Sequence, residues 1–218
     1  YSNGLPASTW QERYLNIFDC ITVVGREQRA ESVKGKNKSS CKGVLFHCTT
    51  IGLNPIEFFT KRKELENLIA DEVKKVDFVI ARLALFGAIA AKYAKKYHKP
   101  YICEVVGSAW DDNWNYSFMG KMVAPYFEWL VKKTVKDSQY TIYVTQNYLQ
   151  KEYPTKGKSI GISNVYIKSV DETVLTRRMA RIDKTDCKKM VFCTIAAVDV
   201  RYKGQAYMFE AMKKLKGN

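Results

Sequence analysis

The feature that most constrains the fold is the alternation of short apolar runs with longer stretches of helical periodicity. Residues 20–25 (CITVVG) have the length and β-branched composition of a buried strand. Residues 54–76 instead repeat apolar side chains at the spacing of one helix face. Strands that alternate with helices predict an α/β domain with a Rossmann-like, mainly parallel sheet and flanking helices. Further strands are expected at residues 44–50, 77–82, 101–107, 140–145, 158–165 and 190–196.

The helices expected between these strands have recognisable start signals. Asn54 as the N-cap and Pro55 in the first turn indicate where the longest apolar repeat begins. Other helices are expected at residues 13–18, 86–97, 119–135, 146–153, 172–182 and 205–214.

The helix expected at residues 119–135 has two chemically different sides. We expect its lysines to lie opposite an apolar stripe. Those lysines form either a solvated face or a basic patch that faces a membrane. The stripe consists of Met122, Val123, Tyr126, Phe127 and Leu130, and the lysines are Lys121, Lys132, Lys133 and Lys136.

The charge balance indicates anionic partners. The 218 residues include 36 Lys and Arg against 22 Asp and Glu, a net charge of +14. Phosphorylated ligands, acidic membrane surfaces and nucleic acid all fit such an excess. Nucleic acid is not expected as a partner, because no helix-turn-helix, RNP-like strand or zinc-ligand spacing is present and the basic residues are dispersed. The six cysteines include no CxxC pair, so no metal site is expected.

The last part of the chain has the pattern of an anion site. Arg201, Lys203 and Gly204 lie between the strand expected at 190–196 and the helix expected at 205–214. Free N–H groups at a helix N-terminus favour an anion, glycine permits close approach, and the lysine adds a charge. The alternative interpretation is a solvated turn.

A second candidate site follows the strands at residues 77–82 and 101–107. Ligands of open parallel sheets bind beyond the carboxyl ends of strands. Arg82 at the first of these ends is either an acceptor-phosphate ligand or an ordinary surface residue. The loop GSAWDDNWNYS at the second has aromatic faces and carboxylates suited to a sugar, namely Trp110, Asp111, Asp112 and Trp114. Alternatively, the tryptophans fill the core and the aspartates cap the next helix.

Several of these motifs together resemble GT-B glycosyltransferases of family 4. The stretch VFCTIAAVDVRYKGQAYMFEAMKKL is similar to the opening of that family's second domain, with Lys203, Gly204 and Ala211 in matching places. Ala197 and Val198 stand where the family has Gly-Arg, so Arg201 would have to supply the missing charge. The stretches KPYICEVVGSAWDDNWNY, YVTQNYLQKEYP and GISNV resemble the first domain of a bacterial subgroup that builds surface polysaccharides. The histidine found near this loop in many relatives is missing here.

The resemblance implies a domain organisation. Residues 1–170 would form an N-terminal acceptor-side domain, and residues 171–187 a linker helix and hinge. Residues 188–218 would begin a nucleotide-sugar-binding domain that is truncated, its acidic donor-binding pair lying beyond Asn218. Such a tail is expected to dock on the first domain or to self-associate through an exposed strand edge.

The resemblance also implies a function. The full-length protein would transfer a sugar from a nucleotide-sugar donor to a lipid-linked or polysaccharide acceptor, with retention and with no cofactor or obligatory metal. The resemblance implies that Lys203, Arg201 and Gly204 bind the donor phosphates. The expected acceptor-binding residues are Arg82, Trp110, Asp111, Asp112 and Trp114, with Asp111 as the catalytic candidate. A cytoplasmic location, peripheral at the inner face of the membrane, would follow. A basic nucleic-acid-binding module or another nucleotide-binding α/β module is the alternative.

Overall fold

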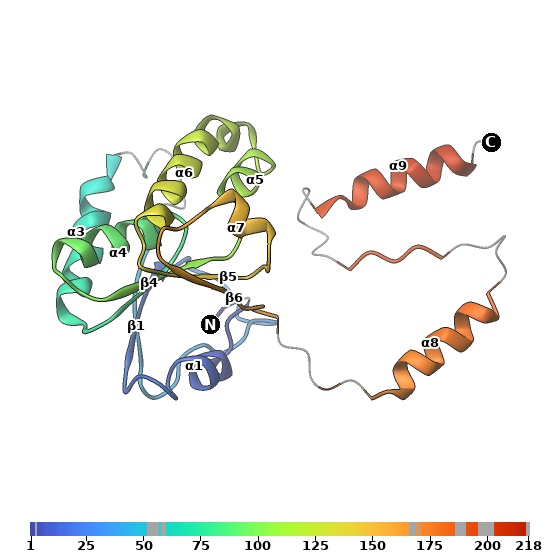
Figure 1. The fold of residues 1–218 in the computed structure, drawn as a ribbon, viewed down its shortest axis with the longest axis horizontal. Coiled ribbons are helices and arrows are strands. Elements are labelled where there is room, and N and C mark those ends of the chain that lie inside the picture. Colours follow the sequence, from blue (N-terminus) through green and yellow to red (C-terminus); the bar gives the residue numbers. More distant parts are fainter. Residues whose placement is uncertain are drawn as a thin grey trace.

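Two parallel sheets form the framework of the chain in a computed structural model (Figure 1). It describes residues 1–2, 4–51, 57, 60–165, 169, 171–185, 191–195 and 203–216. The smaller sheet pairs β1 (Ile21–Arg26) with β2 (Val44–Thr49). The larger sheet has the order β3 (Val79–Arg82), β4 (Tyr101–Val105), β5 (Tyr140–Tyr143) and β6 (Lys158–Gly161). The prediction of a parallel α/β domain is confirmed, but with two described sheets rather than one.

Helices separate the strands of the larger sheet in chain order, whereas no helix is described between β1 and β2. The helices are α1 (Ala7–Arg13), α3 (Arg62–Lys75), α4 (Leu85–Lys96), α5 (Ala109–Trp114), α6 (Phe118–Lys136), α7 (Tyr148–Glu152), α8 (Thr173–Asp183) and α9 (Gln205–Lys216). The start predicted at Asn54 lies outside the described residues.

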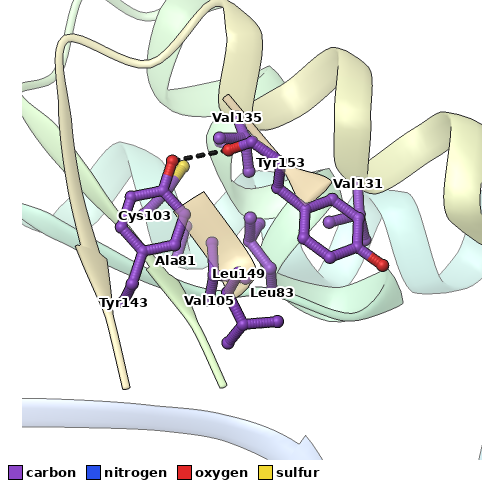
Figure 2. Close-up of a cluster of buried hydrophobic side chains, with 10 residues drawn as sticks. Ala81, Leu83, Cys103, Val105, Val131, Val135, Tyr143, Leu149 and Tyr153 are labelled. Carbon is purple, nitrogen blue, oxygen red and sulfur yellow. Dashed lines mark hydrogen bonds between the residues drawn. The ribbon is translucent and has the colours of Figure 1, made fainter. Parts of the chain in front are cut away.

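The core consists of two clusters of buried side chains. One joins α3 and α4 to the sheet through residues such as Leu65, Ile69 and Ile89. The other packs β3, β4 and β5 against α6 and α7 and includes Tyr143 and Tyr153, both about 1% exposed. Figure 2 shows this second cluster, in which the Tyr143 hydroxyl donates to the main-chain oxygen of Tyr153 at 2.6 Å. Complete burial of each large apolar side chain contributes about 1.5–3 kcal/mol, so these clusters fix the positions of the strand ends.

The prediction of a helix at residues 13–18 is wrong. Helix α1 begins after Pro6 and ends at Arg13, and turns follow from Tyr14. The earlier start buries Trp10, whose ring lies 6.0 Å from that of Phe46 on β2. Packing of this one large side chain therefore decided the position of the helix.

The apolar stripe named within residues 119–135 is not the main buried face of α6. Met122 is 66% exposed and Tyr126 is 36% exposed. Small and β-branched residues form the buried face instead, because they let α6 approach the sheet closely. That face consists of Gly120, Ala124, Val131 and Val135.

The strand predicted at residues 190–196 is absent from the part that the structure describes. Residues 191–195 have no regular structure and are exposed. Helix α8, which precedes them, has no buried residue among those described. A strand needs neighbours to pair with, and no described strand lies beside this segment. Self-association was predicted through the exposed edge of this strand, and the described residues contain no strand there that could mediate it.

Candidate functional site

The carboxyl ends of β3, β4 and β5 meet at one edge of the larger sheet because all three strands are parallel. Arg82 is the last residue of β3, Gly107 and Ser108 follow β4, and Thr145 follows β5. Helix α1 approaches the same edge, since Arg13 Nη2 donates to the main-chain oxygen of Asn164, beyond β6, at 2.7 Å. The topology therefore gathers residues from three strand ends and from α1 at one edge of the sheet.

Arg82 forms an ion pair at this edge. Its Nη1 lies 3.4 Å from Oε2 of Glu104 on β4. The Glu104 side chain is only 16% exposed, whereas that of Arg82 is 49% exposed. Tyr14 lies near this pair at the end of α1, where burial and then the Glu104 charge raise the pKa of its hydroxyl. A guanidinium, a carboxylate and a phenol thus lie together, and they can exchange hydrogen bonds with a hydroxylated or anionic ligand.

Glu104 was missed by the sequence interpretation. The signal was an acidic residue inside the otherwise apolar run YICEVV, where a buried carboxylate needs a partner. The position of Arg82 itself depends on Gly87 at the start of α4. A Cβ at Gly87 would lie 2.1 Å from the main-chain oxygen of Arg82, so only glycine permits this approach.

The segment after β4, predicted as a loop, forms the short helix α5. Ser108 caps it by accepting a hydrogen bond from the main-chain N–H of Asp111 at 3.1 Å. Tyr153 holds its first residue, because the tyrosine hydroxyl accepts from the N–H of Ala109 at 2.8 Å. The same hydroxyl donates to Oε2 of Glu128 on α6 at 2.6 Å. Helix α5 is therefore attached both to the core and to α6.

The two aspartates of α5 occupy different environments. Asp111 accepts from the hydroxyl of Tyr148 on α7 at 3.3 Å. Asp112 lies over the backbone of Gly107, where a Cβ would be 2.9 Å from Asp112 Oδ2. Burial and then the charge of Asp111 raise the pKa of the Asp112 carboxyl, and the charge of Lys203 acts in the opposite direction. A carboxyl with a raised pKa beside a strand end is suited to exchange protons with a bound hydroxyl.

The alternative that these aspartates cap the following helix is wrong. Ser117 caps α6, accepting from the N–H of Gly120 at 3.0 Å. The alternative that the tryptophans fill the core is also wrong, since Trp110 is 36% exposed and Trp114 is 39% exposed. Their rings stack on each other with centroids 4.9 Å apart and an angle of 15°. Each ring therefore has one face covered by its partner. The ammonium of Lys121 lies 5.6 Å from the centre of the Trp114 ring, so the outer face of Trp110 is the one that remains for stacking on a sugar ring.

Of the residues predicted to bind a donor phosphate, Lys203 and Gly204 are described, and Arg201 lies outside the described residues. Lys203 is exposed and directly precedes Gly204, whose φ of 85° favours glycine. Helix α9 begins at the next residue, as predicted.

Two surface hollows of the described chain lie away from this edge. One is lined by Lys95, Lys136 and Lys156 with the segment 137–139. The other is lined by residues that include His47, Cys48, Asp71 and Glu72. Within the described residues, no group of three or more His, Cys, Asp and Glu side chains is arranged to hold a metal ion.

Comparison with known proteins gives one informative similarity. The chain is 38% identical over 168 residues to Protein CapJ of Staphylococcus aureus. The match covers 76% of this chain and 43% of that protein, so the chain spans less than half the length of its relative. No family model matches the chain, and no solved structure matches it. None of the helices that the structure describes is long and apolar enough to cross a membrane.

Proposed function

We propose that this chain is the acceptor-side part of a retaining GT-B glycosyltransferase that acts in the assembly of a capsule-type polysaccharide. The observation that supports this most is the similarity to Protein CapJ over 76% of the chain. The parallel sheet supports it as well, because polar and aromatic residues gather at the carboxyl ends of β3, β4 and β5. The donor would be a nucleotide sugar, and the acceptor a lipid-linked or polymeric saccharide.

In this proposal the acceptor binds along the edge formed by β3, β4 and α5. Arg82 and Glu104 would bind a phosphate or a hydroxyl at one end. Asp111 and Asp112 would accept hydrogen bonds from sugar hydroxyls, and the outer face of Trp110 would stack on a ring. Asp112 is the better candidate for proton exchange, because burial and the neighbouring Asp111 raise its pKa.

The donor phosphates would bind at the start of α9. The ammonium of Lys203 and the N-terminus of α9 supply positive charge there, and Gly204 permits close approach. A partly desolvated contact of this kind contributes about 1.5–3 kcal/mol. Lys203→Ala in the full-length enzyme is therefore expected to lower kcat/KM for the donor by about tenfold to a hundredfold.

The test of the function is transfer by the full-length protein from a panel of radiolabelled UDP- and GDP-sugars to membrane lipid extracts. Asp112→Asn is expected to lower the rate by about a hundredfold or more, as the loss of a proton-exchanging group does. Asp71→Asn is the matched control, because Asp71 is a carboxylate on α3 whose side chain is 61% exposed. It should transfer at the unchanged rate.

Two results would contradict the proposal. Absence of transfer from every donor, together with tight binding of oligonucleotides, would assign the chain to a nucleic-acid-binding class. Transfer by Asp112→Asn at the rate of the Asp71→Asn control would preserve the class but exclude the acceptor site at α5.

A further inference from the structure

Helix α6 exposes an apolar face to solvent. The α6 outer face, as we call it, consists of Phe118, Met119, Met122, Tyr126 and Trp129, whose exposed fractions are 78%, 46%, 66%, 36% and 53%. Met119, Met122, Tyr126 and Trp129 recur three or four positions apart, and Phe118 lies four positions before Met122, so the five lie along one side of the helix. The opposite side of α6 is buried against the sheet. The helix is thus apolar on both sides, although one side would suffice to hold it in the fold.

The outer face belongs to a well-fixed part of the molecule. Ser117 caps the start of α6, and Val131 and Val135 of its last turns are 2% and 0% exposed. Glu128 attaches its middle to Tyr153 of the core. The exposure of these side chains is therefore not a result of local unfolding, because α6 itself is firmly attached to the fold. Large aromatic and methionine side chains that a rigid helix presents to water indicate a contact surface.

Basic residues flank the outer face. The ammonium of Lys133 lies 5.0 Å from the centre of the Trp129 ring, and that of Lys121 lies 5.6 Å from the centre of the Trp114 ring. Arg62 of α3 donates from Nη1 to the Tyr126 hydroxyl at 3.2 Å. Arg62 is balanced by its ion pair with Glu66 at 2.8 Å, so the ammonium groups of Lys121 and Lys133 are the charges that make the surroundings of the face positive. A complementary partner is therefore apolar in its interior and negatively charged on its surface.

We propose that the α6 outer face binds the surface of an anionic lipid bilayer. A bilayer offers this combination, because its acyl region lies beneath negatively charged head groups. Tryptophan and tyrosine place their rings at that boundary, and lysine stems extend so that the ammonium reaches the phosphates. Helix α6 would lie in the plane of the interface, consistent with the absence of any membrane-spanning helix among those described. This inference does not depend on the proposed glycosyltransferase activity.

The test measures co-sedimentation of the 218-residue chain with two kinds of sucrose-loaded vesicle. One is pure phosphatidylcholine, and the other contains 30% phosphatidylglycerol. The chain should bind the second kind at least about tenfold more tightly, and 0.5 M NaCl should weaken that binding because salt screens the head-group charge. Quenching of tryptophan emission by brominated acyl chains should show that an indole enters the boundary region.

Variants separate the apolar from the electrostatic contribution. The double variant Met122→Ser with Trp129→Ser should lose about tenfold or more in partitioning, because it removes two inserting side chains. Replacing Lys121 and Lys133 with glutamine should cost about fivefold each, which corresponds to about 1 kcal/mol per basic residue near an anionic surface. All four positions lie on the solvent side of α6, so far-UV circular dichroism should be unchanged.

The matched control lies on α8, which also exposes apolar side chains. Leu175 is 68% exposed and Met179 is 50% exposed. Leu175→Ser with Met179→Ser removes a similar exposed area from another helix and should bind the anionic vesicles like the unmodified chain. If this control loses binding and the α6 variant does not, the proposal is wrong.

Two further outcomes would overturn the proposal. Equal binding to both kinds of vesicle, insensitive to salt, would contradict an anionic surface. A dimer seen by light scattering without lipid, and abolished by Met122→Ser with Trp129→Ser, would show that the outer face is covered by a second copy of the chain.

Discussion

Replacing Tyr153 with phenylalanine tests how α5 is held against the core. The hydroxyl accepts from the Ala109 N–H at 2.8 Å and donates to Glu128 Oε2 at 2.6 Å. The residue is about 1% exposed and packs in the cluster of Figure 2. The substitution removes one oxygen atom and keeps the ring, so the core remains filled.

The expected loss follows from the two hydrogen bonds. A bond to a charged acceptor contributes about 1.5–3 kcal/mol, and a bond between neutral groups about 0.5–1.5 kcal/mol. Part of this is recovered, because Glu128 keeps its ion pair with Lys132 at 2.9 Å and the half-buried Ala109 can reach water. We therefore expect the free energy of unfolding to fall by about 2 kcal/mol.

The assay is urea denaturation followed by far-UV circular dichroism. The near-UV signal of the stacked Trp110 and Trp114 on α5 should also weaken at low urea, because the start of α5 loses its attachment. Tyr140→Phe is the control, since Tyr140 is 50% exposed. Equal urea midpoints for Tyr153→Phe and Tyr140→Phe, with an unchanged near-UV signal, would refute the reasoning.

Three other substitutions test separate parts of the fold. Gly87→Ala should destabilise the chain by more than about 2 kcal/mol, because its Cβ would meet the main-chain oxygen of Arg82, and a lower thermal midpoint checks this. Burial alone would raise the pKa of Glu66, but hydrogen bonds from groups such as Lys92 outweigh it and lower the pKa to about 2. The resulting stability is present above the unfolded value near 4.5 and is lost as the pH falls toward 2, so Glu66→Gln should flatten the acid side of a plot of urea midpoint against pH. Burial raises the pKa of Tyr101 to about 12, so stability should fall as the pH rises from about 10 to 12, and Tyr101→Phe should reduce that fall.

The alternation of strands and helices was enough to predict a parallel α/β fold, because each apolar run has one periodicity and a clear boundary. Helix α6 shows where this reasoning fails. Periodicity identifies that a helix has an apolar side, but α6 has two, and the choice depends on side-chain volume. Gly120 and Ala124 face the sheet because they let the helix approach it, which leaves Met122 in water.

The candidate site was predictable to the extent that strand ends could be located. Arg82, Asp111 and Asp112 were identified because they follow apolar strands. The contributions of Glu104 and Tyr14 were not predicted. They depend on the pairing of β3 with β4 and on the position of α1, and both of these are set by long-range contacts. The strand predicted at 190–196 has the right composition, but composition cannot supply the neighbouring strand that a β-ladder requires.

The division of the described strands into two sheets has a consequence for how the molecule opens. No backbone ladder joins the described strands β1 and β2 to the other four, so side-chain packing connects them, with Val24 against the cluster of α3 and α4. Side-chain contacts and backbone ladders need not break together. We expect the amide protons of β1 and β2 to exchange with solvent through a local opening that leaves β3 to β6 protected. The chain would then behave as two cooperative units of unequal stability, and the edge proposed to bind the acceptor would belong to the unit that exchanges more slowly, β3 to β6.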